Sequence, residues 1–238
     1  MAKISIKQIF RATADVLMPR TCSVCDGVLD GDERYLCRQC LAALPLTRLE
    51  KVEFNAMEQR FAGKVPIERA TALFYYDRGN PYTHIIHDIK YRNMPRMGVW
   101  MGALAARNIA PTQFFDGIDF LIPVPLHRSK LIVRGYNQSM QIAVGISQET
   151  GITAVDNVLI APQPHSSQTR KGAEERSLNT SGIFKCTSRA ASFAGKHVLI
   201  VDDVVTTGST TLACAEALQH ACPQIKISIL SLAVTRLD

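Results

Sequence analysis

The hydrophobic positions of the chain form two patterns, short unbroken apolar runs and longer stretches with helical spacing. Unbroken runs between polar turns are typical of buried strands, and apolar residues three and four positions apart indicate helices. Because the two patterns alternate, they favour an α/β domain with a mainly parallel sheet. We expect strands within residues 70–76, 120–126, 198–201 and 225–234, and helices from about 82 to 89, over 97–105, over 138–147 and over 211–221.

One stretch, VLIVDDVVTTGST over residues 198–210, combines a buried run with two acids and a small hydroxyl-rich loop. The helix that follows offers free N–H groups and the positive end of its dipole, which favours an anion. Like charges repel, so Asp202 and Asp203 suit two vicinal sugar hydroxyls rather than a phosphate. The stretch therefore predicts a ribose 5-phosphate site, with the acids on the ribose and the phosphate on Thr206, Thr207, Gly208, Ser209 and Thr210.

Basic residues gather in two further places. The loop after the strand at 120–126 carries Arg128, Lys130 and Arg134, enough positive charge for a pyrophosphate. Residues 90–96 add a basic cluster with an aromatic residue, Tyr91. That cluster could meet a pyrophosphate or a nucleic-acid backbone, or it could be a solvated helix end.

Residues 162–180 are polar and almost free of large apolar side chains. Long loops of this kind in a compact domain are usually functional or disordered. Residues 162–180 are therefore either a candidate lid over an anionic ligand or a surface loop with no ligand. The polar residues that favour the lid are His165, Gln168, Arg170, Lys171 and Arg176.

Four cysteines, Cys22, Cys25, Cys37 and Cys40, form two C-x2-C pairs near the N-terminus. Two such pairs supply the four thiolates of a tetrahedral structural zinc site, which has no open position for catalysis. A pair of disulfides or a redox motif would compete with this interpretation. We favour zinc, because no secretory signal is visible and because one redox motif would not explain two pairs.

Composition changes the picture only slightly. The chain has 238 residues, 47% of them hydrophobic, and a net charge of +6, which suits phosphate-bearing partners, including nucleic acid, but also fits a solvated basic surface. Charged residues interrupt residues 1–20, so we expect no signal peptide or membrane span there and a cytoplasmic protein. Ile6, Ile9, Phe10, Thr13 and Leu17 instead fit one face of an amphipathic helix. Residues 41–68 are expected to link this N-terminal part to the main domain.

The motif at 198–210 resembles the phosphoribosyl-pyrophosphate (PRPP) signature of type I phosphoribosyltransferases. Together with the four cysteines, residues 122–127 (IPVPLH), residues 134–138 (RGYNQ) and Gln168, Arg176 and Asn179, it resembles the ComF (competence protein F) family. The resemblance implies an N-terminal helix and zinc-ribbon module over residues 1–60. Residues 61–238 would then form a phosphoribosyltransferase-like domain, a mainly parallel twisted sheet with flanking helices and a hood over the strand ends.

The chain departs from the family pattern twice. No further cysteine occurs between Cys40 and Cys186, which argues against a second zinc ion. Residues 164–167 read PHSS where relatives usually carry more arginine, so the resemblance does not fix the ligand contacts of the lid.

The resemblance implies a protein that binds a PRPP-type ligand with Mg2+ and assists DNA uptake or recombination, with single-stranded DNA and DNA-processing proteins as partners. The alternative is a catalytically active Mg2+-dependent phosphoribosyltransferase, a pentosyl-class glycosyltransferase acting on an unidentified nitrogenous acceptor. Asp202 and Asp203 would then be the catalytic pair, and Arg128, Lys130, Arg134, Gln168 and Arg176 would serve the pyrophosphate or the lid. A third interpretation is a PRPP-sensing regulator that grips a partner protein.

Overall fold

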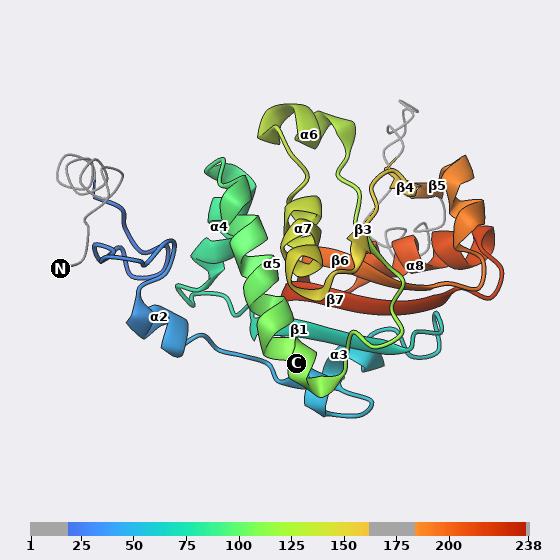
Figure 1. The fold of residues 1–238 in the computed structure, drawn as a ribbon, viewed down its shortest axis with the longest axis horizontal. Coiled ribbons are helices and arrows are strands. Elements are labelled where there is room, and N and C mark those ends of the chain that lie inside the picture. The colour runs from blue at the N-terminus through green and yellow to red at the C-terminus, as the bar shows by residue number, and fades with distance from the viewer. Residues whose placement is uncertain (1–18, 162–183, 237–238) are drawn as a thin grey trace, which may run out of the picture.

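The structure is a computed structural model that describes residues 19–161 and 184–236. Its core is a five-stranded parallel sheet (Figure 1). The strands lie in the order β1-β7-β6-β2-β3. This arrangement confirms the expected α/β class with a mainly parallel sheet. The strands are β1 (Arg69–Tyr75), β2 (Phe120–Pro123), β3 (Thr153–Ala154), β6 (His197–Val205) and β7 (Lys226–Val234).

The central strand β6 is longer than its apolar run, residues 198–201, predicts, whereas β7 agrees with the expected strand over 225–234 to within one residue. β6 continues through Asp202 and Asp203 to Val205, which pairs with Val234 of β7. The apolar run ends at residue 201, but pairing with the apolar β7 holds the two acids in extended conformation. Both acids therefore belong to the strand itself rather than to a loop after it.

Helices cover the two faces of the sheet. On one face α4 (Thr83–Tyr91), α5 (Pro95–Ile109) and α7 (Gln138–Thr150) pack over β6 residues such as Leu199 and Val201. On the other face α8 (Ser209–Ala221) covers Val198 and Ile200. Alternate residues of β6 thus enter opposite cores, as expected for a parallel strand buried on both sides.

The helices α5 and α7 approach each other at two glycines. A Cβ atom added to Gly102 would lie 2.1 Å from the carbonyl oxygen of Ile142, and one added to Gly145 would lie 2.0 Å from that of Val99. No side chain fits in so little space. The close contact fixes α7, and with it the residues at the start of α7 that face the ends of the strands.

The segment expected to be a linker folds back onto the sheet instead. Leu49, Met57, Phe61 and Val65 are buried in the core on the α8 side. The buried side chain of Asn55 caps α3 (Ala56–Gln59) through the N–H groups of residues 57 and 58, and it donates to the carbonyl oxygen of Ala70 at 2.9 Å. The apolar residues of the segment 41–68 are isolated in the sequence because charged residues separate them. The short 3-10 helix η1 (Leu49–Lys51) precedes α3.

The cysteine module lies at one end of the molecule (Figure 1). It contains α2 (Arg38–Ala42) and packs against α4 and α5. The rings of Tyr35 and Trp100 are 5.7 Å apart, and the hydroxyl of Tyr82 donates to the carbonyl oxygen of Cys40 at 2.8 Å. The module is therefore held directly against the main core.

The loop predicted to carry Arg128 and Lys130 is helical in the structure. Residues Arg128–Arg134 form α6, which projects from the rest of the molecule in Figure 1. Its N-cap is His127, a residue outside the usual capping set, and Gly135 ends it in the left-handed conformation with φ 80°. The capping glycine is visible in the sequence, but the histidine cap gave no signal.

The remaining elements are short. β4 (Leu159–Ile160) and β5 (Lys185–Cys186) form an antiparallel pair, and η2 (Ala110–Thr112) and η4 (Ser188–Phe193) are 3-10 helices. The predicted N-terminal helix and the candidate lid, with His165, Gln168, Arg170, Lys171 and Arg176, lie outside the described residues. Within the described part of the chain, no helix has the length and apolar character needed to cross a membrane.

Candidate functional site

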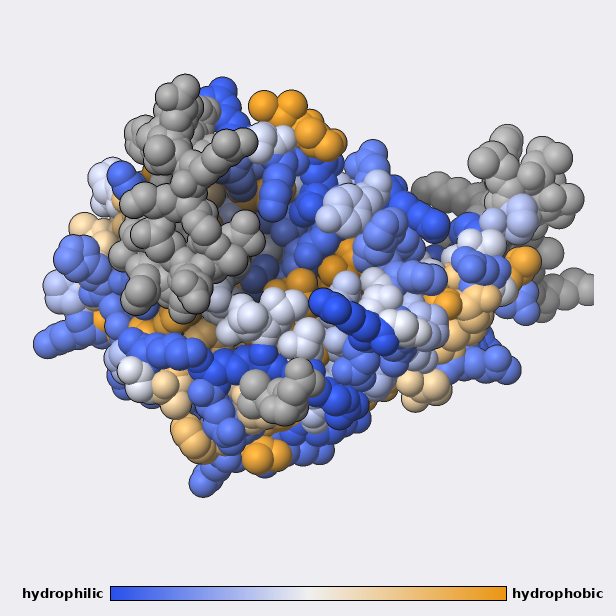
Figure 2. Space-filling view, turned by 180° about the vertical axis from the view of Figure 1, so that it is seen from behind, coloured by the Kyte–Doolittle hydropathy of each residue, from blue (hydrophilic) through white to orange (hydrophobic). Residues whose placement is uncertain are grey.

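The candidate site lies at the carboxyl ends of β2 and β6, two neighbouring strands after which the chain turns to opposite faces of the sheet. After β2 the chain passes through α6 into α7 on one face of the sheet, whereas β6 continues into α8 on the other face. In open parallel sheets this divergence leaves a crevice outside the carboxyl ends of the strands, where ligands bind. Seen from behind, the molecule has a hollow with mostly hydrophilic residues around it (Figure 2).

Two adjacent carboxylates of β6, Asp202 and Asp203, are buried at this crevice, 6% and 2% exposed. Asp202 Oδ1 accepts hydrogen bonds from the backbone N–H of Asp203 at 2.8 Å and from the hydroxyl of Ser139 at 3.2 Å. Ser139 belongs to the first turn of α7, next to the N-cap Asn137. The close packing of α7 therefore places a donor on the carboxylate.

The environment of Asp202 disfavours its charged form. Burial, and then the neighbouring charge of Asp203, raise the pKa of Asp202 to about 7, and its hydrogen bonds and Lys90 offset only part of that effect. Structural positions seldom keep a buried carboxyl at such a cost. A strongly raised pKa in a crevice is typical of functional sites.

Asp203 has one satisfied and one unsatisfied oxygen. Its Oδ1 pairs with Lys90 Nζ at 2.7 Å, and the side chain of Lys90, from the end of α4, is 20% exposed. Its Oδ2 is buried and has no hydrogen-bond partner among the described residues. Because buried polar atoms are nearly always paired, this oxygen is available to a donor such as a sugar hydroxyl.

The loop after β6 presents hydroxyls at the start of α8. Thr206, Thr207, Ser209 and Thr210 are exposed, and Gly208 is the N-cap with φ 82°. The hydroxyls of Thr207 and Ser209 are 2.9 Å apart. α8 has 13 residues, so its first N–H groups and dipole can favour an anion beside these hydroxyls.

Two residues that the sequence did not single out support this loop from outside. The guanidinium group of Arg60 donates to the carbonyl oxygens of Thr206 and Thr235. The ring of Phe61 lies 3.3 Å from the position that a Cβ atom of Gly208 would take. Arg60 and Thr206 are 146 positions apart, so no local pattern could reveal the contact.

The predicted basic residues are only partly gathered at the carboxylates. Arg134 donates to Gln138, and its guanidinium carbon lies 5.4 Å from the ring centroid of Tyr91. Lys130 and Arg134 line a hollow of about 650 Å³ between α4 and α6, together with Lys90 and Tyr91. Arg128 begins α6 and is exposed. Lys90, not these three, contacts the acids.

The four N-terminal cysteines come together as predicted. All four Sγ atoms of Cys22, Cys25, Cys37 and Cys40 lie within 4.8 Å of one another, and those of Cys25 and Cys37 are 3.9 Å apart. Four thiolates around a tetrahedral zinc ion, at about 2.3 Å each, would be about 3.8 Å apart. The Sγ atoms of Cys22 and Cys37 each accept a backbone N–H bond at 3.4 Å. The donor set therefore suits a structural metal ion.

Comparison with known proteins gives matches of two kinds. Residues 137–235 match the family model of the phosphoribosyl transferase domain. The chain is 29% identical over 133 residues to competence protein F of Haemophilus influenzae, covering 55% of this chain and 58% of that protein. It is 26% identical over 200 residues to the DNA utilization protein YhgH of Escherichia coli K12, covering 83% of each chain, and YhgH of Shigella flexneri matches equally.

A solved structure gives a weaker match. The purine phosphoribosyltransferase from Pyrococcus horikoshii Ot3 is 20% identical, with a TM-score of 0.33, covering 57% of this chain and 82% of that one. The sequence relatives are the stronger finding, and they confirm the family resemblance that the motifs indicate. The chain is therefore similar to competence protein F and YhgH, matches the phosphoribosyl transferase domain over residues 137–235, and carries an N-terminal four-cysteine cluster.

Proposed function

We propose that the protein binds a ribose 5-phosphate ligand of PRPP type at Asp202, Asp203 and the loop 206–210. The observation that carries the proposal is the buried Asp203 Oδ2, which has no partner among the described residues and lies on the same strand that leads to the anion-binding start of α8. One ligand with vicinal hydroxyls and a phosphate satisfies both features. Mg2+ would accompany PRPP as the counterion of its pyrophosphate.

We further propose that the protein assists DNA uptake. Its relatives carry the names competence protein F and DNA utilization protein. The chain has a net charge of +6, and Tyr91 is 68% exposed beside Lys90, Lys130 and Arg134. An exposed aromatic ring among cations suits single-stranded DNA, because bases stack on the ring while the cations meet the phosphates.

The ligand site is tested by isothermal titration calorimetry with PRPP and Mg2+. Replacing both acids, Asp202→Asn with Asp203→Asn, removes two carboxyl groups that can accept from the ribose hydroxyls, so we expect PRPP binding to weaken at least about 100-fold. The pair Asp116→Asn with Asp156→Asn removes exposed carboxylates elsewhere and should leave the affinity within about twofold. PRPP affinity that survives in the first pair would refute this site.

Because the pKa of Asp202 is raised, we predict that the buried carboxyl lowers the free energy of unfolding by an amount that depends on pH. Its pKa is about 7 in the folded protein and near 4 when unfolded, so the folded state holds the extra proton between these values. Stability therefore falls as pH rises through this window. Relative to wild type, Asp202→Asn should gain about 3 kcal/mol in free energy of unfolding from about pH 4 to about pH 7. Urea denaturation measures it, and a difference that does not vary with pH contradicts the assignment.

We propose that the metal ion of the cysteine cluster is zinc and that it holds the module against α5. Trp100, the only tryptophan, contacts Tyr35 of the module and reports on this packing. We expect about one zinc ion per chain, loss of zinc in Cys25→Ser but not in Cys186→Ser, and a red shift of tryptophan emission on chelation. Metal analysis without zinc, or emission unchanged by chelation, would count against the proposal.

The DNA proposal predicts binding of oligo-dT that weakens steeply with salt, because counterions are released. Tyr91→Ala should reduce the affinity by about 1 to 3 kcal/mol. The matched control is Phe54→Ala, since Phe54 is also exposed, at 63%, but lines a hollow with Glu50, Glu53 and Glu58. Fluorescence anisotropy measures both. Salt-independent binding, or equal losses in the two variants, would overturn the proposal.

A further inference from the structure

A second hollow, of about 830 Å³, lies beside the loop 206–210. It opens where β1, β7 and β6 end, on the side of the loop away from β2. Of the predicted pyrophosphate residues that the structure describes, Arg128, Lys130 and Arg134, none lines it. Its lining consists of Arg60, Lys64, Tyr76, Asp77, Arg78, Thr206, Thr207, Thr235 and Arg236.

Positive charge exceeds negative charge in this hollow. Four cationic side chains line it against one carboxylate, Asp77, which pairs with Arg236 at 3.3 Å. Among the described residues, Arg60, Lys64 and Arg78 have no carboxylate within ion-pair distance. Three cations without a counter-charge around one concave surface attract an anion.

The cationic side chains are partly fixed in place. Arg60 is held by the carbonyl oxygens of Thr206 and Thr235, and its buried Nε has no hydrogen-bond partner among the described residues. Lys64 Nζ donates to the carbonyl oxygen of Arg60 at 2.9 Å. The guanidinium carbon of Arg236 lies 3.7 Å from the ring centroid of Tyr75. A site whose charged groups are already positioned loses less entropy when an anion binds.

The hollow is continuous with the proposed phosphate site. Thr206 and Thr207 line the hollow and also begin the hydroxyl-rich loop at the start of α8. A phosphate held by that loop would therefore have its outer side towards Arg60, Lys64 and Arg78. Any group attached to the outer side of a 5′-phosphate would enter the hollow.

We infer that the hollow is a second anion subsite, which takes the next phosphate group beyond a ribose 5-phosphate bound at the loop 206–210. The inference rests on the proposed function. The ligand is then a nucleotide extended at its 5′ side, either a nucleoside polyphosphate or the terminal nucleotide of a strand. Both sources carry a second phosphate on the outer side of the 5′-phosphate, joined through an anhydride oxygen in the polyphosphate and through the preceding ribose in the strand.

The inference is tested by calorimetry on the full chain at fixed Mg2+ and ionic strength, with three probes. UMP carries only the 5′-phosphate, UTP adds a polyphosphate, and the trinucleotide UpUpU adds a strand. We expect UTP, UpUpU or both to bind wild type about tenfold more tightly than UMP, since each charge-assisted contact adds affinity.

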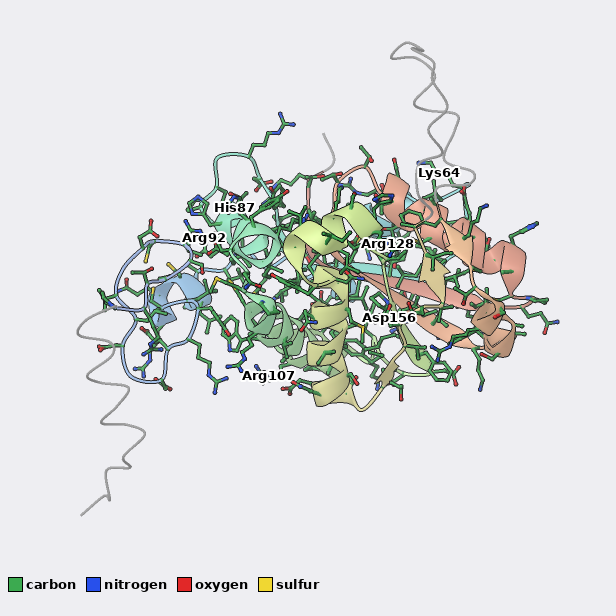
Figure 3. All side chains as sticks on the ribbon, turned by 90° about the horizontal axis from the view of Figure 1, so that it is seen from above. Lys64, His87, Arg92, Arg107, Arg128 and Asp156 are labelled. Atoms are coloured by element: carbon green, nitrogen blue, oxygen red, sulfur yellow. The ribbon has the colours of Figure 1, made fainter. Side chains whose placement is uncertain are left out.

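Variants locate the added affinity. Lys64→Gln with Arg78→Gln should reduce the affinity for the extended probes about tenfold and leave UMP within about twofold. The matched control, Arg107→Gln with Lys185→Gln, removes the same charge elsewhere, and Figure 3 shows Lys64 and Arg107 on opposite sides of the molecule. The control should leave all three affinities within about twofold.

The outcomes separate the two proposals. Equal binding of all probes to wild type, or equal losses in the two charge variants, overturns the second subsite. A preference for UTP alone or UpUpU alone supports the subsite and identifies the source of the phosphate. Loss of UTP affinity in the Lys64 and Arg78 variant, with UMP unbound and Asp203→Asn without effect, supports the anion hollow and refutes the ribose site.

Discussion

The burial of two neighbouring carboxylates on the central strand β6 is the constraint on which the rest of the site depends. Asp202 and Asp203 repel each other and are almost inaccessible to solvent, and the pKa of Asp202 rises to about 7 as a result. Ser139 from α7 and Lys90 from α4 offset part of this cost, each with one contact. One oxygen of Asp203 remains without a partner among the described residues. The strand β6 and the helices α4 and α7 are therefore arranged around one unpaired oxygen of Asp203, which a hydrogen-bond donor in the crevice can satisfy.

Two distant parts of the chain position this centre. α4 begins at the cysteine module, where Tyr82 donates to the carbonyl oxygen of Cys40, and near its end Lys90 reaches Asp203. On the opposite face Arg60 and Phe61 support the loop 206–210 from outside. The module and the segment around α3 thus contribute to the site without containing either its acids or its hydroxyls.

Sequence reasoning identified what depends on neighbouring residues and missed what depends on distant ones. The alternation of strands and helices, the strand β7 and the cysteine cluster follow from local patterns. The sequence does not predict α6 because a histidine caps it, and it favours a linker before β1 because charged residues separate the buried side chains there. The Arg60–Thr206 and Lys90–Asp203 contacts form only in the folded chain, so no spacing in the sequence encodes them. The assignment of ligand contacts to Arg128, Lys130 and Arg134 stays a prediction.

A crystal structure of the protein with ribose 5-phosphate tests the central claim most directly. We predict that the phosphate lies at the first N–H groups of α8, among the hydroxyls of Thr207, Ser209 and Thr210. We also predict that a ribose hydroxyl donates to Asp203 Oδ2, the buried oxygen without a partner among the described residues. A sugar phosphate bound elsewhere, or one bound at the loop with both carboxylates out of its reach, would contradict the account.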